Sequence, residues 1–194
     1  VGGVFDLADK IYAARKQKPM SAVVSETACS AGYLLAAAAG DISVSQTASA
    51  GSIGVVATHA DYSGWFKSMG TVHTQIYAGS HKVDASPLKT LSKDAKASIQ
   101  ADVDDTYKKF TESVAKYRGM SVDSVVATEA AVYSGQKAVD AGLADRVESY
   151  EQSMSRLTAG NQKTEEGKTM SVTTTQQNAE QKPNGQQSME TTED

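Results

Sequence analysis

The chain has 194 residues, of which 40% are hydrophobic and 22% charged, enough for one sizeable core. This composition excludes collagen-like, disulfide-dense and membrane-spanning chains, and the longest apolar run, at 34–39, is far too short to cross a bilayer. The net charge of -4 is uneven, because three lysines and six acidic residues lie from residue 161 onward. The nearly neutral remainder lacks the basic excess expected of a protein that binds nucleic acid or an anionic membrane. The single cysteine, Cys29, cannot form an internal disulfide, so the fold does not depend on an oxidising compartment.

Apolar spacing, β-branched runs and glycine or proline stops predict an alternation of helices and strands along the body. Helices are expected at 5–15, 30–39, 62–69 and 92–117, with short ones beginning at Ser121 and Ser134; strands are expected at 20–25, 42–45, 53–58, 72–77 and 143–147. Ser92 suits the N-cap of the long helix and Gly119 its end. Strands separated by helices indicate an α/β fold.

The C-terminal part has a different composition from the body. Residues 159–194 are rich in Gln, Thr, Asn, Glu and Ser and hold no aromatic side chain. Such a segment cannot bury enough apolar area to offset the entropy of ordering it. We therefore expect a globular domain at 1–158, followed by a disordered linker or the start of an extension at 159–194. Met170 is a candidate internal start, although an isolated methionine usually has no such role.

Ser30 is the candidate nucleophile, because it lies where a predicted strand gives way to a helix. Backbone N–H groups at the start of a helix are free to hold the oxyanion that forms when a serine attacks a carbonyl. The small neighbours Ala31 and Gly32 leave room for a substrate backbone. Serine is also a favoured helix N-cap, so the position alone does not distinguish catalysis from capping.

A serine nucleophile needs a base, and the polar loop at 78–86 offers two. His81 and Asp84 could complete a Ser-His-Asp set. Lys82 is the other candidate, since a lysine acts as a base when burial or a neighbouring cation keeps it neutral. His59 and His73 lie on or beside strand segments, where a surface or satisfied histidine is the more common role.

Several motifs in a fixed order resemble peptidase family S49, the signal peptide peptidase A family, and within it the phage branch of lambda-type head maturation proteases. The resemblance covers about residues 1–150. Its motifs are CSAGY at 29–33, GSIGV at 51–55, GSHKVD at 79–84, TEAAVYSGQ at 128–136 and DAGLAD at 140–145.

This resemblance implies a ClpP/crotonase-like α/β fold and a serine endopeptidase with a Ser/Lys dyad and no cofactor or metal. By position, Ser30 is the nucleophile, Lys82 the general base, Ser52 the serine that orients the base, and the Ala31 N–H an oxyanion donor. Cys29, a competing thiol in principle, occupies a position that the family fills with Ala or Cys, which favours packing. The implied substrates or partners are phage scaffold, portal and capsid proteins in the prohead of a host cytoplasm, with neither nucleic acid nor membrane.

The resemblance also implies a ring of identical subunits, and it leaves open whether the dyad forms within one chain or between two. Family members carry a Ser/Thr-Pro-Gly-Gly turn upstream that supplies a second oxyanion donor, and this chain begins after it. Gly2 and Gly3 correspond instead to the start of the following helix. Losing one such donor costs about two to three orders of magnitude in rate. We therefore expect impaired activity unless the chain is a fragment of a longer product.

Three alternatives remain open. The first is a catalytically silent assembly protein, a prophage remnant. The second is a bacterial signal peptide peptidase. The third is a crotonase-type acyl-CoA enzyme, which would share the fold but would not need the Ser/Lys pair.

Overall fold

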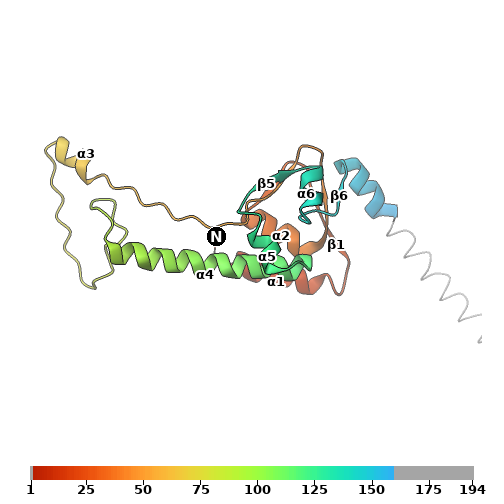
Figure 1. Ribbon diagram of the computed structural model, residues 1–194, viewed down its shortest axis with the longest axis horizontal. Coiled ribbons are helices and arrows are strands. Elements are labelled where there is room, and N and C mark those ends of the chain that lie inside the picture. The colour runs from red at the N-terminus through yellow and green to blue at the C-terminus, as the bar shows by residue number, and fades with distance from the viewer. Residues whose placement is uncertain (1, 160–194) are drawn as a thin grey trace, which may run out of the picture. The chain divides into compact units, whose positions relative to one another are not determined.

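The computed structural model describes residues 2–159 (Figure 1). The chain divides into two compact units, the first at 1–150 and the second from 151 onward. Residues 150–159 are helical, and apart from residue 159 the predicted tail at 159–194 lies outside the described residues. The first unit contains every strand found among residues 2–159 and all the candidate site residues.

This unit mixes helices and strands, which confirms the predicted α/β class. Its helices are α1 (Val4–Ala14), α2 (Ala31–Ala39), α3 (Ser63–Ser68), α4 (Lys93–Arg118), α5 (Val122–Val126) and α6 (Gln136–Asp140). Its strands are β1 (Met20–Val24), β2 (Thr27–Cys29), β3 (Gly40–Val44), β4 (Ser49–Gly51), β5 (Val132–Ser134) and β6 (Arg146–Val147).

The strands form two small sheets of three strands each. In the order β1-β3-β6 all pairs are parallel, and β1 and β3 match from Met20↔Gly40 to Val24↔Val44. In the order β2-β4-β5 the first pair is parallel and the second antiparallel, so that Gly51 lies opposite both Cys29 and Val132. This second sheet places the segment after β4 beside the end of β2, where Ser30 follows.

Helix α2 forms the centre of the core. Its alanines are small enough to let α1 and α4 pack closely against it, and it also contacts β1, β2 and β3. Tyr33 is fully buried, and its hydroxyl donates a hydrogen bond to the Leu143 carbonyl at 2.9 Å. Burial raises the pKa of Tyr33, so this hydroxyl remains a donor at all ordinary pH values.

Helix α4 begins and ends where the sequence predicts. The Ser92 hydroxyl accepts a hydrogen bond from the Ala95 N–H, and Gly119 ends the helix with a positive φ of 66°. In the last turn Arg118, with a side chain only 6% exposed, donates to the Gly142 carbonyl and to both oxygens of Asp145. This network joins the end of α4 to the turn that precedes β6.

Two predicted strands are wrong. Residues 53–58 and 72–77 form no strand and pair with no strand among residues 2–159. Three short strands were not predicted, β2, β4 and β5. Ser134 ends β5 instead of starting a helix, and the N-cap of the helix that follows is Gly135. The remaining predicted elements are present, with ends shifted by at most a few residues.

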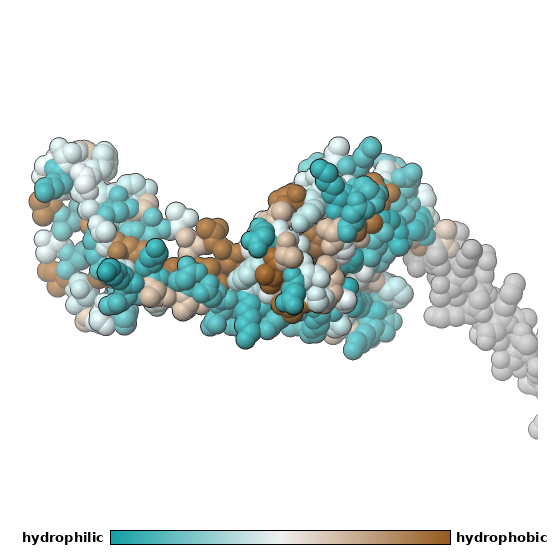
Figure 2. Space-filling model, viewed as in Figure 1, coloured by the Kyte–Doolittle hydropathy of each residue, from teal (hydrophilic) through white to brown (hydrophobic). Residues whose placement is uncertain are grey.

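Residues 55–91, which we call the arm, leave the sheet after β4 and return to the start of α4. Figure 1 shows the extended part of the arm running beside α4 to α3. The arm carries seven large hydrophobic residues that are exposed: Val56, Tyr62, Trp65, Met69, Val72, Ile76 and Tyr77. Among them Val72 is 85% exposed and Ile76 95% exposed. Figure 2 shows hydrophobic surface on this part of the molecule, an unusual amount for a segment that faces only solvent.

Candidate active site

Ser30 occupies the turn between β2 and α2, as predicted. It is exposed, its φ and ψ are 52° and -125°, and its side chain makes no capping hydrogen bond. The Ser30 N–H donates to the Gly51 carbonyl at 2.9 Å, which anchors the turn to the end of β4. A serine held at positive φ on a sharp strand-to-helix turn, with a free hydroxyl, has the geometry of a nucleophile elbow.

A second turn in the same protein indicates how unusual this serine is. Gly135 joins β5 to α6 with φ and ψ of 51° and -123°, nearly the same backbone conformation as Ser30. Glycine adopts this conformation without cost, whereas any residue with a Cβ is strained there. At the second turn the sequence uses glycine, and at the first it retains a hydroxyl despite the strain.

Ser30 opens into a cavity of about 490 Å³. Helix α4 contributes Thr106 and Phe110, which lie one turn apart, and α1 contributes Val4 and Phe5. The other lining residues are Gly2, Ala31, Leu34, Gly54, Val55 and Val56. Sequence reasoning missed the contribution of α4; the i, i+4 spacing of Thr106 and Phe110 was the available signal, but such spacing is more often that of a core face.

Two predicted supporting groups lie beside Ser30. Among residues 2–159 the Ala31 N–H has no acceptor, so it is available to a ligand at the start of α2. Ser52 is half-buried, has a φ of 53°, and its N–H donates to the Ala131 carbonyl at 2.9 Å. Gly2 and Gly3 precede α1, and Gly3 is its N-cap, as expected.

Lys82, the predicted general base, does not lie beside Ser30. It is exposed and lies on a loop in the returning half of the arm, which is held to the start of α3 by a hydrogen bond from the Tyr62 N–H to the Pro87 carbonyl at 2.8 Å. This loop precedes the first turn of α4, whereas the Ser30 cavity reaches Thr106, thirteen residues into the helix. At the α-helical rise, those residues span roughly 20 Å. A single chain therefore does not bring Lys82 to Ser30.

The other candidate base is on the same loop. His81 Nδ1 lies 2.8 Å from Asp84 Oδ2, and the histidine side chain is 85% exposed. The pair has the contact that a Ser-His-Asp set requires between its last two members, but it shares the position of Lys82, away from Ser30. His59 is satisfied, with Nε2 3.0 Å from the Ser86 carbonyl oxygen.

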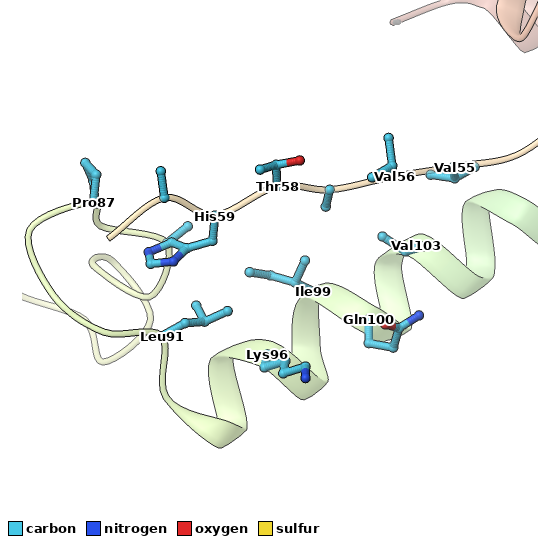
Figure 3. A pocket seen from close by; sticks show the side chains of 13 residues that line it. Val55, Val56, Thr58, His59, Pro87, Leu91, Lys96, Ile99, Gln100 and Val103 are labelled. Carbon is cyan, nitrogen blue, oxygen red and sulfur yellow. The ribbon is translucent and has the colours of Figure 1, made fainter. Parts of the chain in front are cut away.

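A larger cavity, of about 730 Å³, lies between the arm and the first half of α4 (Figure 3). Ile99 and Val103 point from α4 toward the extended segment that carries Val55 and Val56. Leu91 closes the end nearest to the loop of Lys82. The cavity is largely apolar and joins the region of Ser30 to that of the candidate bases along one side of α4.

Comparison with known proteins identifies the family. The family model described as Peptidase family S49 matches residues 12–165. This chain belongs to peptidase family S49. The match includes Ser30, Ser52 and Lys82 and spans most of the chain, which confirms the resemblance seen in the motifs.

Relatives of this S49 chain include two phage proteins. It is 48% identical over 147 residues to the capsid assembly protease C of Escherichia phage lambda, covering 76% of this chain and 34% of that protein. It is 46% identical over 145 residues to the head-tail preconnector protein GP5 of Enterobacteria phage P21, covering 75% and 29%. A putative signal peptide peptidase SppA of Enterococcus faecium is 30% identical over 151 residues, covering 75% and 44%. The chain thus spans only about a third of the length of the two phage relatives.

Neither a metal-ion site nor a membrane-spanning helix is found in the described part of this S49 chain. Within residues 2–159 no group of three or more His, Cys, Asp or Glu side chains is placed to hold a metal ion. Within the same range no helix has the length and apolar character needed to cross a membrane.

Proposed function

We propose that this chain is the peptidase domain of a serine endopeptidase that cleaves scaffold and capsid proteins during phage head maturation. In this proposal residues 1–158 adopt a ClpP/crotonase-like form of the α/β fold and act on the prohead within the host cytoplasm. The names of the two phage relatives support this role over that of a bacterial signal peptide peptidase, because their identity to the chain is far higher than that of the SppA relative.

The observation that carries the proposal is the Ser30 turn. An exposed hydroxyl held at positive φ, beside an unpaired Ala31 N–H and over a cavity lined mainly by apolar side chains, is the arrangement that acyl transfer requires. In the proposed reaction the Ser30 Oγ attacks the scissile carbonyl carbon and the Ala31 N–H holds the resulting oxyanion. The apolar cavity accepts a side chain of the substrate.

The general base in this proposal is Lys82 from a neighbouring copy of the chain. Within one chain roughly 20 Å of α4 separates the two regions, so a second copy has to supply the amine. The exposed apolar residues of the arm are suited to such an interface, since a ring can be built from one repeated heterologous contact. Burial of a lysine disfavours its charged form, and contact with the neighbour would let the amine act as a base.

The proton then follows a short path. The Lys82 amine takes the proton from the Ser30 hydroxyl as the C–O bond forms, and it returns that proton to the leaving amine as the peptide C–N bond breaks. Water repeats the cycle on the acyl-enzyme. Ser52, half-buried beside Ser30, orients the Lys82 amine of the neighbouring copy in this scheme.

Mixing two inactive variants tests the proposal. Ser30→Ala and Lys82→Ala, each in the complete product of its gene, are expected to lose cleavage of a co-expressed scaffold protein. Co-assembled in equal amounts, they should regain about a quarter of the wild-type activity, because random mixing in a ring pairs an intact serine with an intact lysine at that frequency. Cleavage by either variant alone would contradict the dyad, and no recovery on mixing would contradict its formation between chains.

Two alternatives are tested by the same assay. The His81–Asp84 contact favours a histidine base as the second candidate, and His81→Ala should then abolish cleavage while Lys82→Ala does not. The separation of Ser30 from both bases is also what a silent assembly protein would have. If the wild-type protein assembles but never cleaves, that alternative replaces the peptidase.

A further inference from the structure

Within residues 2–159, strained backbone gathers in one place. Among residues 2–159 only four residues other than glycine have a positive φ: Ser30 at 52°, Ser52 at 53°, Glu129 at 49° and Ala130 at 56°. Glu129 and Ala130 lie about a hundred residues from Ser30 in the sequence, yet all four belong to one connected cluster. Strain persists only where the surrounding structure enforces it, and it gathers at sites where geometry matters.

Two hydrogen bonds and two close contacts connect the cluster. The Ala131 carbonyl accepts the Ser52 N–H at 2.9 Å, and the Gly51 carbonyl accepts the Ser30 N–H at the same distance. A Cβ placed on Gly51 would lie 2.7 Å from the Ala131 oxygen, so this carbonyl lies tightly against β4. A Cβ placed on Gly54 would lie 2.7 Å from the Ala130 Cβ. The turn at 128–131 therefore contacts both ends of the 51–54 segment.

Hydrogen bonds fix the 128–131 turn to helix α5. Thr128 is buried, and its hydroxyl donates to the Val125 carbonyl in α5 at 2.8 Å. The Ala131 N–H donates to the Thr128 carbonyl, also at 2.8 Å. A turn fixed to a helix in this way can transmit its position to the segment it touches.

We propose that the 128–131 turn is a positioning element for the active site. Through the Ala131 carbonyl and the Ala130 Cβ it fixes residues 51–54. In this segment Gly51 holds the Ser30 backbone and Gly54 lines the Ser30 cavity, with Ser52 between them. This inference rests on the proposed peptidase function for its catalytic readout, while its structural part can be measured without activity. It predicts that moving the turn lowers kcat more than it changes KM.

A pair of compensating substitutions tests the inference. Gly54→Ala adds a Cβ that meets Ala130, and since neither atom belongs to a flexible side chain the backbone has to shift. In the complete gene product we expect kcat to fall about 10- to 100-fold, the loss that a misplacement near 1 Å produces. Ala130→Gly removes the opposing Cβ and suits the positive φ, so the double variant should recover kcat to within about twofold of wild type.

The double variant separates two explanations. Gly54 also lines the Ser30 cavity, so its new Cβ could simply obstruct the substrate. In that case Ala130→Gly would not restore activity, and the positioning role would be overturned. An unchanged kcat in Gly54→Ala would overturn it as well. Gly64→Ala, whose added Cβ meets nothing within 4 Å, is the matched control for thermal stability.

Amide hydrogen exchange provides the readout that does not depend on cleavage. The Ser52 and Ser30 amides should exchange slowly in the wild type and in Ala130→Gly, faster in Gly54→Ala, and slowly again in the double variant. If the wild type cleaves no substrate but this pattern appears, the peptidase proposal fails and the positioning role stands. If exchange is the same in all four proteins, the positioning role fails whatever the activity.

Discussion

Replacing Ser30, the proposed nucleophile, by glycine should stabilise the protein. A residue with a Cβ at the φ and ψ of Ser30 is strained by about 1–3 kcal/mol, and glycine removes that strain while adding about 0.5–1 kcal/mol of unfolded-state entropy. Ser30 is exposed and its hydroxyl caps nothing, so no other interaction is lost. The net gain in the free energy of unfolding for Ser30→Gly is about 1 kcal/mol, or about 2–4 °C in Tm for a domain of this size.

Ser30→Ala is the matched control, because it removes the same hydroxyl but keeps the Cβ and the strain. Its Tm should stay within about 1 °C of the wild type. Both variants are inactive under the proposed mechanism, so any difference between them reports the backbone alone. Urea and thermal unfolding of the three proteins, followed by circular dichroism, measure the difference. If Ser30→Gly is less stable than Ser30→Ala, the strain argument for this turn is incorrect.

Three further predictions concern stability. Gly135→Ala should cost more than about 3 kcal/mol in urea unfolding, because its Cβ would lie 2.3 Å from the Gln46 carbonyl oxygen in addition to the strained φ. Burial alone would raise the pKa of Asp145, but hydrogen bonds, above all from Arg118, outweigh it and lower that pKa, so the carboxylate stabilises the fold above about pH 4 and this contribution is lost as the pH falls further. Asp145→Asn should therefore flatten the acid limb of a plot of unfolding free energy against pH, and it should lower that free energy by roughly 2 kcal/mol at pH 7. A steeper acid limb in the variant would contradict the lowered pKa of Asp145. Tyr33→Phe leaves a buried carbonyl without its donor and should cost about 1–2 kcal/mol with unchanged assembly on gel filtration.

Local chemistry explains which parts of the fold the sequence predicted. Ser92 and Gly119 delimit α4 because capping and the left-handed end depend on single residues and their immediate neighbours. The Lys18-Pro19 step and Gly40 likewise mark the ends of the first two helices within a few residues. Where a boundary is set by the residue itself, the sequence is sufficient.

Pairing between strands is what sequence patterns missed. Residues 53–58 and 72–77 have β-branched side chains and adopt extended backbone, but a strand also needs a partner, and this chain provides none among its described residues. Conversely, Ser49–Gly51 has little β-propensity and becomes a strand because β2 and β5 lie on either side of it. In both cases long-range placement overrides local preference.

The candidate site also combines features that local sequence determines with features that long-range placement determines. The position of Ser30 at a strand-to-helix turn followed from local sequence, and Ser52 and Ala31 lie beside it as the motifs suggested. The roles of these residues and of Lys82 remain proposals. That Lys82 lies far from Ser30 within one chain depends on how the arm leaves the body, and no motif encodes that distance.

The two halves of the proposed dyad are held by different kinds of structure, and this determines how activity should depend on assembly. Ser30 is fixed in each chain by the hydrogen bond from its N–H to the Gly51 carbonyl of β4, so its strained turn exists in the monomer. Lys82 lies on an exposed loop, and in the proposed mechanism a neighbouring copy brings it to a serine and excludes water from it. A separate chain would therefore hold a formed nucleophile without a base. Activity per chain should then rise with protein concentration until assembly is complete, as expected when an association equilibrium supplies part of the site.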